Sequence, residues 1–121
     1  EDYIVFNGPD EQFISGRIIG AKGGIGGTYG VMPELFLKMN EALADKNLEL
    51  AKAIQYDVNA IIYKMCSAHG NMYAVIKAIL KENEGLNLGS VKAPLAPLCE
   101  ADQKVVSEAA AMIREAKKKY L

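Results

Sequence analysis

The stretch from Tyr3 to Gly30, YIVFNGPDEQFISGRIIGAKGGIGGTYG, decides the fold of this chain. It opens with the apolar run Tyr3–Phe6, which predicts a strand buried on both faces of a parallel sheet. A Gly-Pro-Asp-Glu turn at residues 8–11 then leads into a helix that is expected to end at Gly20. Residues 23–28, GGIGGT, have low strand propensity, but glycines in a strand mark places where a backbone or a ligand must come close. The stretch therefore predicts a strand, a helix and a second strand.

The remainder of the chain predicts helices, because apolar residues recur at helical spacing in four segments. Pro33 suits the first position of a helix, and Asn47 suits the cap of the next one. Gly70 and Gly85 are expected to end the second and third of these helices. A connection from Gly85 to Cys99 precedes the last helix, and we expect it to pack along the surface or to serve a site.

Two parallel strands do not make a complete sheet for so many helices. Both edges of such a sheet stay open, and its faces are too small to cover four amphipathic helices. The first strand also begins almost directly after Glu1-Asp2. We therefore expect this chain to be part of a longer protein, with the other strands supplied from upstream or by another chain.

The composition is that of one soluble domain, with 121 residues, 50% apolar residues and 24% charged residues. A net charge of −1 provides no general attraction to nucleic acid or to an acidic membrane, so neither is an expected partner. The apolar runs are too short for a membrane span. Two cysteines, Cys66 and Cys99, do not make a disulfide framework and favour a reduced, intracellular protein.

Asp10 and Glu11 have two interpretations. Carboxylates at the carboxyl end of a strand are where α/β enzymes place ligand-binding groups, and these two would accept hydrogen bonds from a polyhydroxylated ligand. The other interpretation is an Asp10 helix cap with Glu11 as a first-turn acid, which needs no ligand. From spacing alone the cap is the commoner arrangement.

Other groups that could carry chemistry give weaker signals. The Gly23–Gly30 loop is either a backbone that a ligand can approach or a tight strand, and it lacks the Gly-Lys-Ser/Thr of a P-loop. Lys22 precedes its strand, at the end away from the expected site, and is predicted to be a solvated turn residue. His69 is predicted to interact with the terminal carbonyls of the preceding helix. One histidine and two distant cysteines lack metal-ligand spacing, so no metal is expected.

Three segments carry a resemblance to a known family: residues 6–11 (FNGPDE), Ser15-Gly16 and residues 23–29 (GGIGGTY). They resemble N-acetylneuraminate lyases, which are class I aldolases of the dihydrodipicolinate synthase superfamily. The resemblance continues through the helical tail, including residues 90–95 (SVKAPL). It implies an α/β fold, the C-terminal part of a (β/α)8 TIM barrel, with the last two βα units at residues 1–46 and a C-terminal helical segment at residues 47–121.

The resemblance also implies a function. The family cleaves N-acetylneuraminate to pyruvate and N-acetylmannosamine by a retro-aldol reaction through a lysine Schiff base, without a separate cofactor. The expected protein is a cytoplasmic homotetramer that takes a sialic acid or pyruvate-type substrate. This chain would be completed by the missing N-terminal barrel part or by a second copy of itself.

The site residues follow from the same resemblance. The Asn-Gly-Pro-Asp-Glu motif departs from the Asn-Val-Pro-x-Arg-Thr pattern of dihydrodipicolinate synthases, and carboxylates, as pure acceptors, suit the hydroxyl-bearing tail of a sugar. The substrate-binding residues would be Gly8, Asp10, Glu11 and Gly27, with Gly26 and Tyr73 lining the pocket. Relatives often have serine where this chain has Gly27, so a contact there would use the backbone. The Schiff-base lysine and its tyrosine partner belong to earlier strands, so no catalytic residue is expected in this chain.

Two alternatives stay open. The first is another pyruvate-dependent aldolase of the superfamily, either a 2-keto-3-deoxy sugar acid aldolase or an enzyme like dihydrodipicolinate synthase. The second is a non-catalytic helical interaction domain with a short βαβ start. Substrate profiling separates the first from a sialic acid lyase, and a sharp unfolding transition of an isolated monomer would favour the second.

Overall fold

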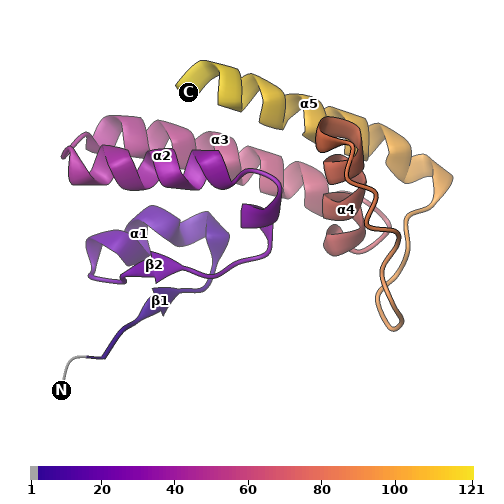
Figure 1. The fold of residues 1–121 in the computed structure, drawn as a ribbon, viewed down its shortest axis with the longest axis horizontal. Helices are drawn as coiled ribbons and strands as arrows, with labels where there is room; N and C mark the ends of the chain where they lie inside the picture. The colour runs from indigo at the N-terminus through magenta and orange to yellow at the C-terminus, as the bar shows by residue number, and fades with distance from the viewer. Residues whose placement is uncertain (1–2) are drawn as a thin grey trace.

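A computed structural model describes residues 3–121 (Figure 1). The chain begins with strand β1 (Phe6–Asn7), helix α1 (Phe13–Ile18) and strand β2 (Gly23–Gly24). The two strands are parallel, with Phe6 opposite Gly23 and Asn7 opposite Gly24. The predicted strand-helix-strand order is therefore confirmed.

Four longer helices follow. The first two of them lie in a layer over the small sheet and α1 (Figure 1). Their bounds are α2 Pro33–Ala44, α3 Leu48–Cys66, α4 Met72–Glu84 and α5 Gln103–Tyr120. Short 3-10 turns lie at Asp10–Gln12, Thr28–Gly30 and Glu100–Asp102. Within residues 3–121, no helix is both long and apolar enough to cross a membrane.

Most of the predicted helix boundaries agree with the structure. Pro33 is the first residue of α2, and the Asn47 side chain caps α3 by accepting a hydrogen bond from the Leu50 N–H at 3.1 Å. Gly85 ends α4 with φ of +71°, a conformation that glycine adopts without a steric penalty. The prediction that Gly70 ends α3 was wrong, because α3 ends at Cys66 and Gly70 lies in the turn before α4.

The first strand differs from its prediction in position and burial. The ladder covers Phe6–Asn7 rather than Tyr3–Phe6, although the Lys22 N–H also reaches the Val5 carbonyl at 2.8 Å. The apolar run is not covered within this chain, since Tyr3 is 78% exposed and Ile4 71%. Within residues 3–121, β2 is the one strand paired with β1, and it lies at one edge of β1. The prediction that this run is buried on both faces was therefore wrong for residues 3–121.

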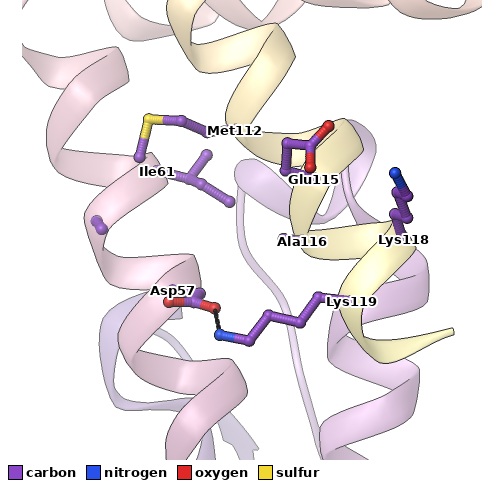
Figure 2. Close-up of a pocket in the computed structure, with 8 residues that line it drawn as sticks. Asp57, Ile61, Met112, Glu115, Ala116, Lys118 and Lys119 are labelled. Atoms are coloured by element: carbon purple, nitrogen blue, oxygen red, sulfur yellow. Dashed lines mark hydrogen bonds and ion pairs between the residues drawn. The ribbon is translucent and has the colours of Figure 1, made fainter.

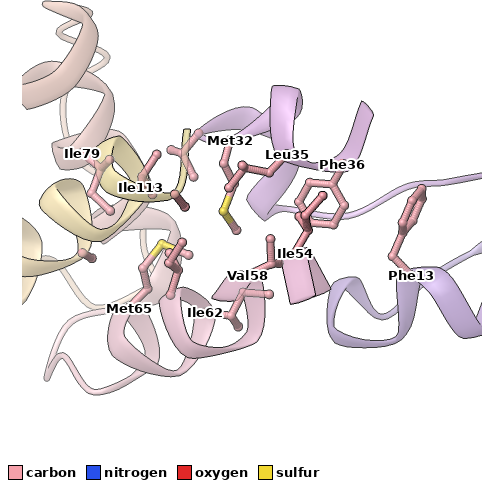
Figure 3. Packing of buried hydrophobic residues seen from close by; sticks show 14 of the residues in the cluster. Phe13, Met32, Leu35, Phe36, Ile54, Val58, Ile62, Met65, Ile79 and Ile113 are labelled. Atoms are coloured by element: carbon pink, nitrogen blue, oxygen red, sulfur yellow. The ribbon is translucent and has the colours of Figure 1, made fainter. Parts of the chain in front are cut away.

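The hydrophobic core lies between the helices, with α3 at its centre (Figure 3). Side chains of α2, α3, α4 and α5 interdigitate there, and Leu35, Ile62, Ile79 and Ile113 are among the fully or almost fully buried ones. Phe13 of α1 packs edge-to-face on Phe36 of α2, with ring centroids 5.4 Å apart. One continuous cluster thus joins residues on both sides of the predicted division at residue 46.

Candidate functional site

The Asp10 carboxylate bonds to the glycine-rich loop rather than to its own helix. Its Oδ2 atom accepts hydrogen bonds from the Thr28 N–H at 2.9 Å and from the Thr28 hydroxyl at 2.6 Å. The interpretation of Asp10 as a helix cap was wrong, because the cap positions are Pro9 for the 3-10 turn and Gln12 for α1, and the cap residue makes no side-chain capping bond at either. The parallel pairing of β1 and β2 brings the turn after one strand beside the loop after the other, and this pairing decides which partner Asp10 finds.

The second oxygen of Asp10 has no donor among the described residues. Oδ1 is buried and unpartnered, and the whole residue is only 7% exposed. This oxygen lies against Gly26, where a Cβ atom would overlap it. A glycine is thus required at position 26. The buried Oδ1 atom of Asp10 is a hydrogen-bond acceptor that still lacks a donor.

Helix α3 holds the backbone of the same turn with two amide side chains. Gln55 donates through Nε2 to the Asp10 carbonyl at 3.1 Å and accepts through Oε1 from the Ile14 N–H at 3.1 Å. Asn59 donates to the Glu11 carbonyl at 3.3 Å and accepts from Gln55 at 2.9 Å. Neither Gln55 nor Asn59 was predicted as a site residue from the sequence. A signal was present, since Gln55 lies within the apolar stripe of α3, where a buried amide needs partners.

Glu11 and Gly8 are both less buried than Asp10. The Glu11 side chain is half-buried, and within residues 3–121 its carboxylate makes no hydrogen bond, so both oxygens remain acceptors. Gly8 is exposed, and a Cβ there would meet nothing within 4 Å. The Asp10 carboxylate is therefore held in place, whereas the Glu11 carboxylate is available to accept hydrogen bonds, although the two residues are neighbours in sequence.

Tyr73 reaches the glycine loop from helix α4. A Cβ atom built on Gly27 would lie 2.8 Å from Cε1 of Tyr73, so the ring occupies the space that a larger residue would need. The Tyr73 N–H is held by the Asn71 side chain at 2.9 Å, and the ring itself is 48% exposed. The fold thus brings together Asp10, Gly26, Gly27 and Tyr73, which are spread over more than 60 positions of sequence.

Tyr29 adds an aromatic wall beside this cluster. Its ring packs on Phe36 with centroids 4.0 Å apart and on Phe13 at 6.0 Å. Burial, followed by the nearby negative charge of Asp10, raises the pKa of Tyr29 to about 12. The phenol therefore stays neutral, and the negative charge of this region is carried by Asp10 and Glu11.

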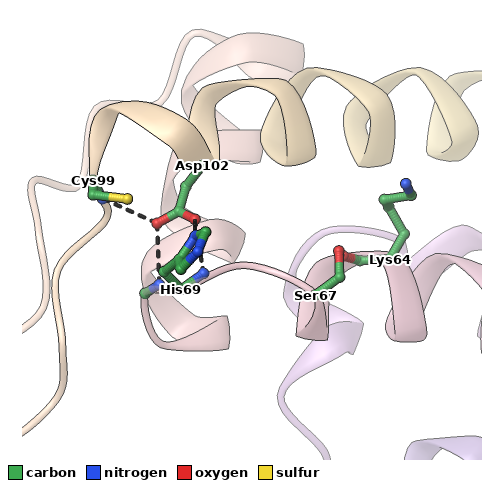
Figure 4. Close-up of polar contacts among 6 residues, drawn as sticks. Lys64, Ser67, His69, Cys99 and Asp102 are labelled. Atoms are coloured by element: carbon green, nitrogen blue, oxygen red, sulfur yellow. Dashed lines mark hydrogen bonds and ion pairs between the residues drawn. The ribbon is translucent and has the colours of Figure 1, made fainter.

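A second polar cluster ties the turn after α3 to the start of α5 (Figure 4). The buried Asp102 carboxylate accepts four hydrogen bonds, which are the N–H groups of His69 (2.7 Å), Gly70 (3.0 Å) and Cys99 (3.0 Å) and Nδ1 of His69 (3.0 Å). The prediction that His69 interacts with helix-terminal carbonyls was wrong, since its ring bonds to Asp102. The ligand atoms of His69, Cys99 and Asp102 lie within 4.8 Å of one another, which the sequence separation did not suggest. Each Asp102 oxygen already accepts two hydrogen bonds, so the arrangement is explained as a structural clamp.

We expect Asp102→Asn to lower the melting temperature of the protein by about 5 °C or more, since an amide presents only one acceptor to these donors. The hydrogen bond from the Cys99 N–H, followed by that from His69, lowers the pKa of Asp102. A carboxyl with a depressed folded pKa stabilises the protein above its unfolded pKa of about 4, and this stabilisation is lost as the pH falls through the folded value. Melting curves between neutral and acidic pH should converge for the wild type and the variant. Exposed Glu100→Gln is the control, and equal curves for both variants would contradict the clamp.

A groove of about 540 Å³ lies elsewhere, between α3 and α5 (Figure 2). Its floor is apolar, with Ile61 and Met112, and its rim carries the ion pair of Asp57 with Lys119 at 2.9 Å. None of the predicted site residues lines it.

Comparison with known proteins places the chain in a family. Residues 1–113 match the model of the dihydrodipicolinate synthetase family. The chain is 65% identical over 120 residues to N-acetylneuraminate lyase of Mediterraneibacter gnavus, which covers 99% of this chain and 38% of that protein. It is 32% identical over 114 residues to N-acetylneuraminate lyase 2 of Escherichia coli O6:H1, with 94% of this chain and 37% of that protein covered.

The solved structures agree with the sequence relatives. A catalytic lysine mutant of the Ruminococcus gnavus sialic acid aldolase superposes with a TM-score of 0.97 and 66% identity, over 98% of this chain and 39% of that chain. This chain thus spans less than two fifths of the relatives it matches. The predicted fold class is confirmed, because two parallel strands followed by helices match the C-terminal part of a TIM barrel and its helical tail. The chain therefore belongs to the dihydrodipicolinate synthetase family.

Proposed function

We propose that this chain is the sugar-binding, C-terminal part of an N-acetylneuraminate lyase. The observation that carries the proposal is the pair of acidic residues at the end of β1: Asp10 with a buried, unpartnered Oδ1, and Glu11 with an open carboxylate. Two acceptors without donors fit a ligand that offers several hydroxyl groups. The 65% identity to a protein named N-acetylneuraminate lyase supports a sialic acid as that ligand.

The loop after β2 completes the proposed binding site. Gly26 and Gly27 present backbone where a side chain would collide with Asp10 or with Tyr73, so a ligand can approach the loop closely. We propose Gly8, Asp10, Glu11 and Gly27 as substrate-binding residues, with Gly26 and Tyr73 lining the pocket. Tyr73 comes from residues 47–121, so the helical segment contributes to a site built mainly by the βα units of residues 1–46.

The bond-breaking step would use residues outside this chain. We propose a Schiff-base lysine with a tyrosine partner on the preceding barrel strands, which would also cover the exposed run Tyr3–Phe6. One of the matched structures is described as a catalytic lysine mutant, which supports lysine chemistry in a close relative. The products would be pyruvate and N-acetylmannosamine. The whole protein would be a cytoplasmic homotetramer of carbohydrate metabolism without a separate cofactor.

A chimera tests this function. The upstream part of the Mediterraneibacter gnavus lyase is joined to this chain at the matched position, which the 65% identity over the shared region makes structurally compatible. We expect the chimera to cleave N-acetylneuraminate at a rate comparable to its parent. Borohydride with pyruvate should label a lysine in the upstream part and none in residues 1–121.

The chimera also separates the alternatives. Pyruvate labelling together with cleavage of a 2-keto-3-deoxy sugar acid but not of N-acetylneuraminate would assign a different aldolase. Covalent labelling within residues 1–121 would contradict the assignment of catalysis to the missing part.

A further inference from the structure

We propose that Thr28 is a positioning residue for substrate recognition, because it fixes the orientation of the Asp10 carboxylate. The inference rests on the proposed function and adds a residue that the motif comparison did not single out. Thr28 is 1% exposed, and its hydroxyl is bonded to Asp10. Its effect on a ligand would therefore pass through Asp10.

The geometry of the contact is specific to one oxygen. Both the N–H and the hydroxyl of Thr28 donate to Oδ2 of Asp10, at 2.9 Å and 2.6 Å. Two donors fill the two lone pairs of that oxygen. The short bond from the hydroxyl is charge-assisted, a class about twice as strong as a bond between neutral groups. Among residues 3–121, Oδ1 is then the carboxylate oxygen of Asp10 without a donor, and it is buried against Gly26, so a ligand would reach it beside that glycine.

The surroundings prevent other arrangements of this carboxylate. Gly26 lies against Oδ1, and the Gln55 side chain holds the Asp10 carbonyl at 3.1 Å, so both the backbone and the free oxygen have fixed places. Threonine is branched at Cβ and has few rotamers, which keeps its hydroxyl aimed at Oδ2. Removing the hydroxyl alone would leave one N–H donor and allow the carboxylate to rotate.

The fixed Asp10 carboxylate and the unbonded Glu11 carboxylate are predicted to bind a ligand differently. Asp10 would accept one substrate hydroxyl through a fixed oxygen, while Glu11 offers two oxygens on an unbonded side chain. A fixed single acceptor discriminates strongly against a substrate that lacks the matching hydroxyl, because a buried acceptor is then left without a donor. Thr28 would therefore contribute to specificity as well as to affinity.

The test uses the full-length protein that contains this chain, with Thr28→Val, Thr28→Ser, Asp10→Asn and the double variant Asp10→Asn with Thr28→Val. Thr28→Val keeps the shape of the side chain and removes the hydroxyl, so we expect KM for N-acetylneuraminate to rise about tenfold or more, with a smaller change in kcat. Thr28→Ser restores the hydroxyl and should restore KM. Labelling by pyruvate and borohydride should be unchanged, since pyruvate has no hydroxyl tail.

The variants separate failure of this inference from failure of the proposed function. If Asp10→Asn leaves KM unchanged, the sugar-binding assignment is wrong. If Asp10→Asn raises KM and Thr28→Val does not, Thr28 does not position Asp10. The KM of the double variant should be no higher than that of Asp10→Asn alone, because both changes disrupt the same contact between Thr28 and Asp10. Additive effects of the two changes on KM would overturn the inference. If the Thr28→Val protein is not labelled by pyruvate and borohydride, Thr28→Cys is tested in its place. The thiol is a weaker hydrogen-bond donor than the hydroxyl, so an unchanged KM for Thr28→Cys would also overturn the inference.

Discussion

Gly26→Ala in the full-length protein is expected to lower kcat/KM for N-acetylneuraminate by about 100-fold or more, because displacing a binding group by even 1 Å has effects of that size. The added Cβ would overlap Oδ1 of Asp10, which has no room to retreat, since Thr28 holds Oδ2. Asp10 would have to break its bonds to Thr28 or push the loop away. Either change removes the fixed acceptor on which the proposed recognition depends.

Gly30→Ala is the matched control for this prediction. It introduces the same methyl group into the same loop, but nothing lies within 4 Å of its Cβ position. Steady-state kinetics on both variants, with pyruvate labelling to show that the barrel is assembled, measure the effect. Equal kcat/KM values for the two alanine variants would show that the contact between Gly26 and Asp10 has no role in substrate binding.

Ile113→Ala is expected to destabilise the protein by about 2–5 kcal/mol, which is the usual cost of removing a buried isoleucine side chain and leaving a cavity. Ile113 is 0% exposed and lies in the cluster shared by α2, α3, α4 and α5 (Figure 3). The site depends on this core, because α3 carries the amides that hold the Asp10 turn and α4 carries Tyr73. Urea unfolding should therefore show the loss of stability.

Two further variants provide reference values for the loss of stability expected of Ile113→Ala. Ile113→Val should cost only about 0.5–1.5 kcal/mol, because it removes one methylene group. Lys104→Ala, on the same helix with an 82% exposed side chain, should change stability by less than about 0.5 kcal/mol. If Ile113→Ala costs no more than Lys104→Ala, α5 does not pack into the core as described.

The helices could be predicted from sequence because their signals are local. Pro33 at a first position, Asn47 as a cap and Gly85 at a left-handed end each act through the backbone of their own helix. The strands were less accurate, because strand length depends on what pairs with the strand. Among residues 3–121, β1 has one partner strand, and its ladder is limited to two residues.

The errors at Asp10 and His69 have a common cause. In both cases the local rule offered a partner on the same helix, and the fold supplied a better one from another segment. Asp10 finds two donors on Thr28, and His69 finds a buried carboxylate 33 positions away at Asp102. Buried charged groups take the partners that satisfy them most fully, and only the folded chain decides which donors those are.

The sequence by itself determined the order of elements and the family, because periodicity, turn chemistry and a short motif involve residues that are close in sequence. It also predicted the residues that would face the ligand in the proposed function. The tertiary structure decided how those residues are held. The pairing of β1 with β2 places Thr28 on Asp10, the docking of α3 brings Gln55 and Asn59 under the turn, and α4 sets Tyr73 against Gly27. These contacts join residues 18 to 48 positions apart, and no local pattern records them because they exist only once the core has packed.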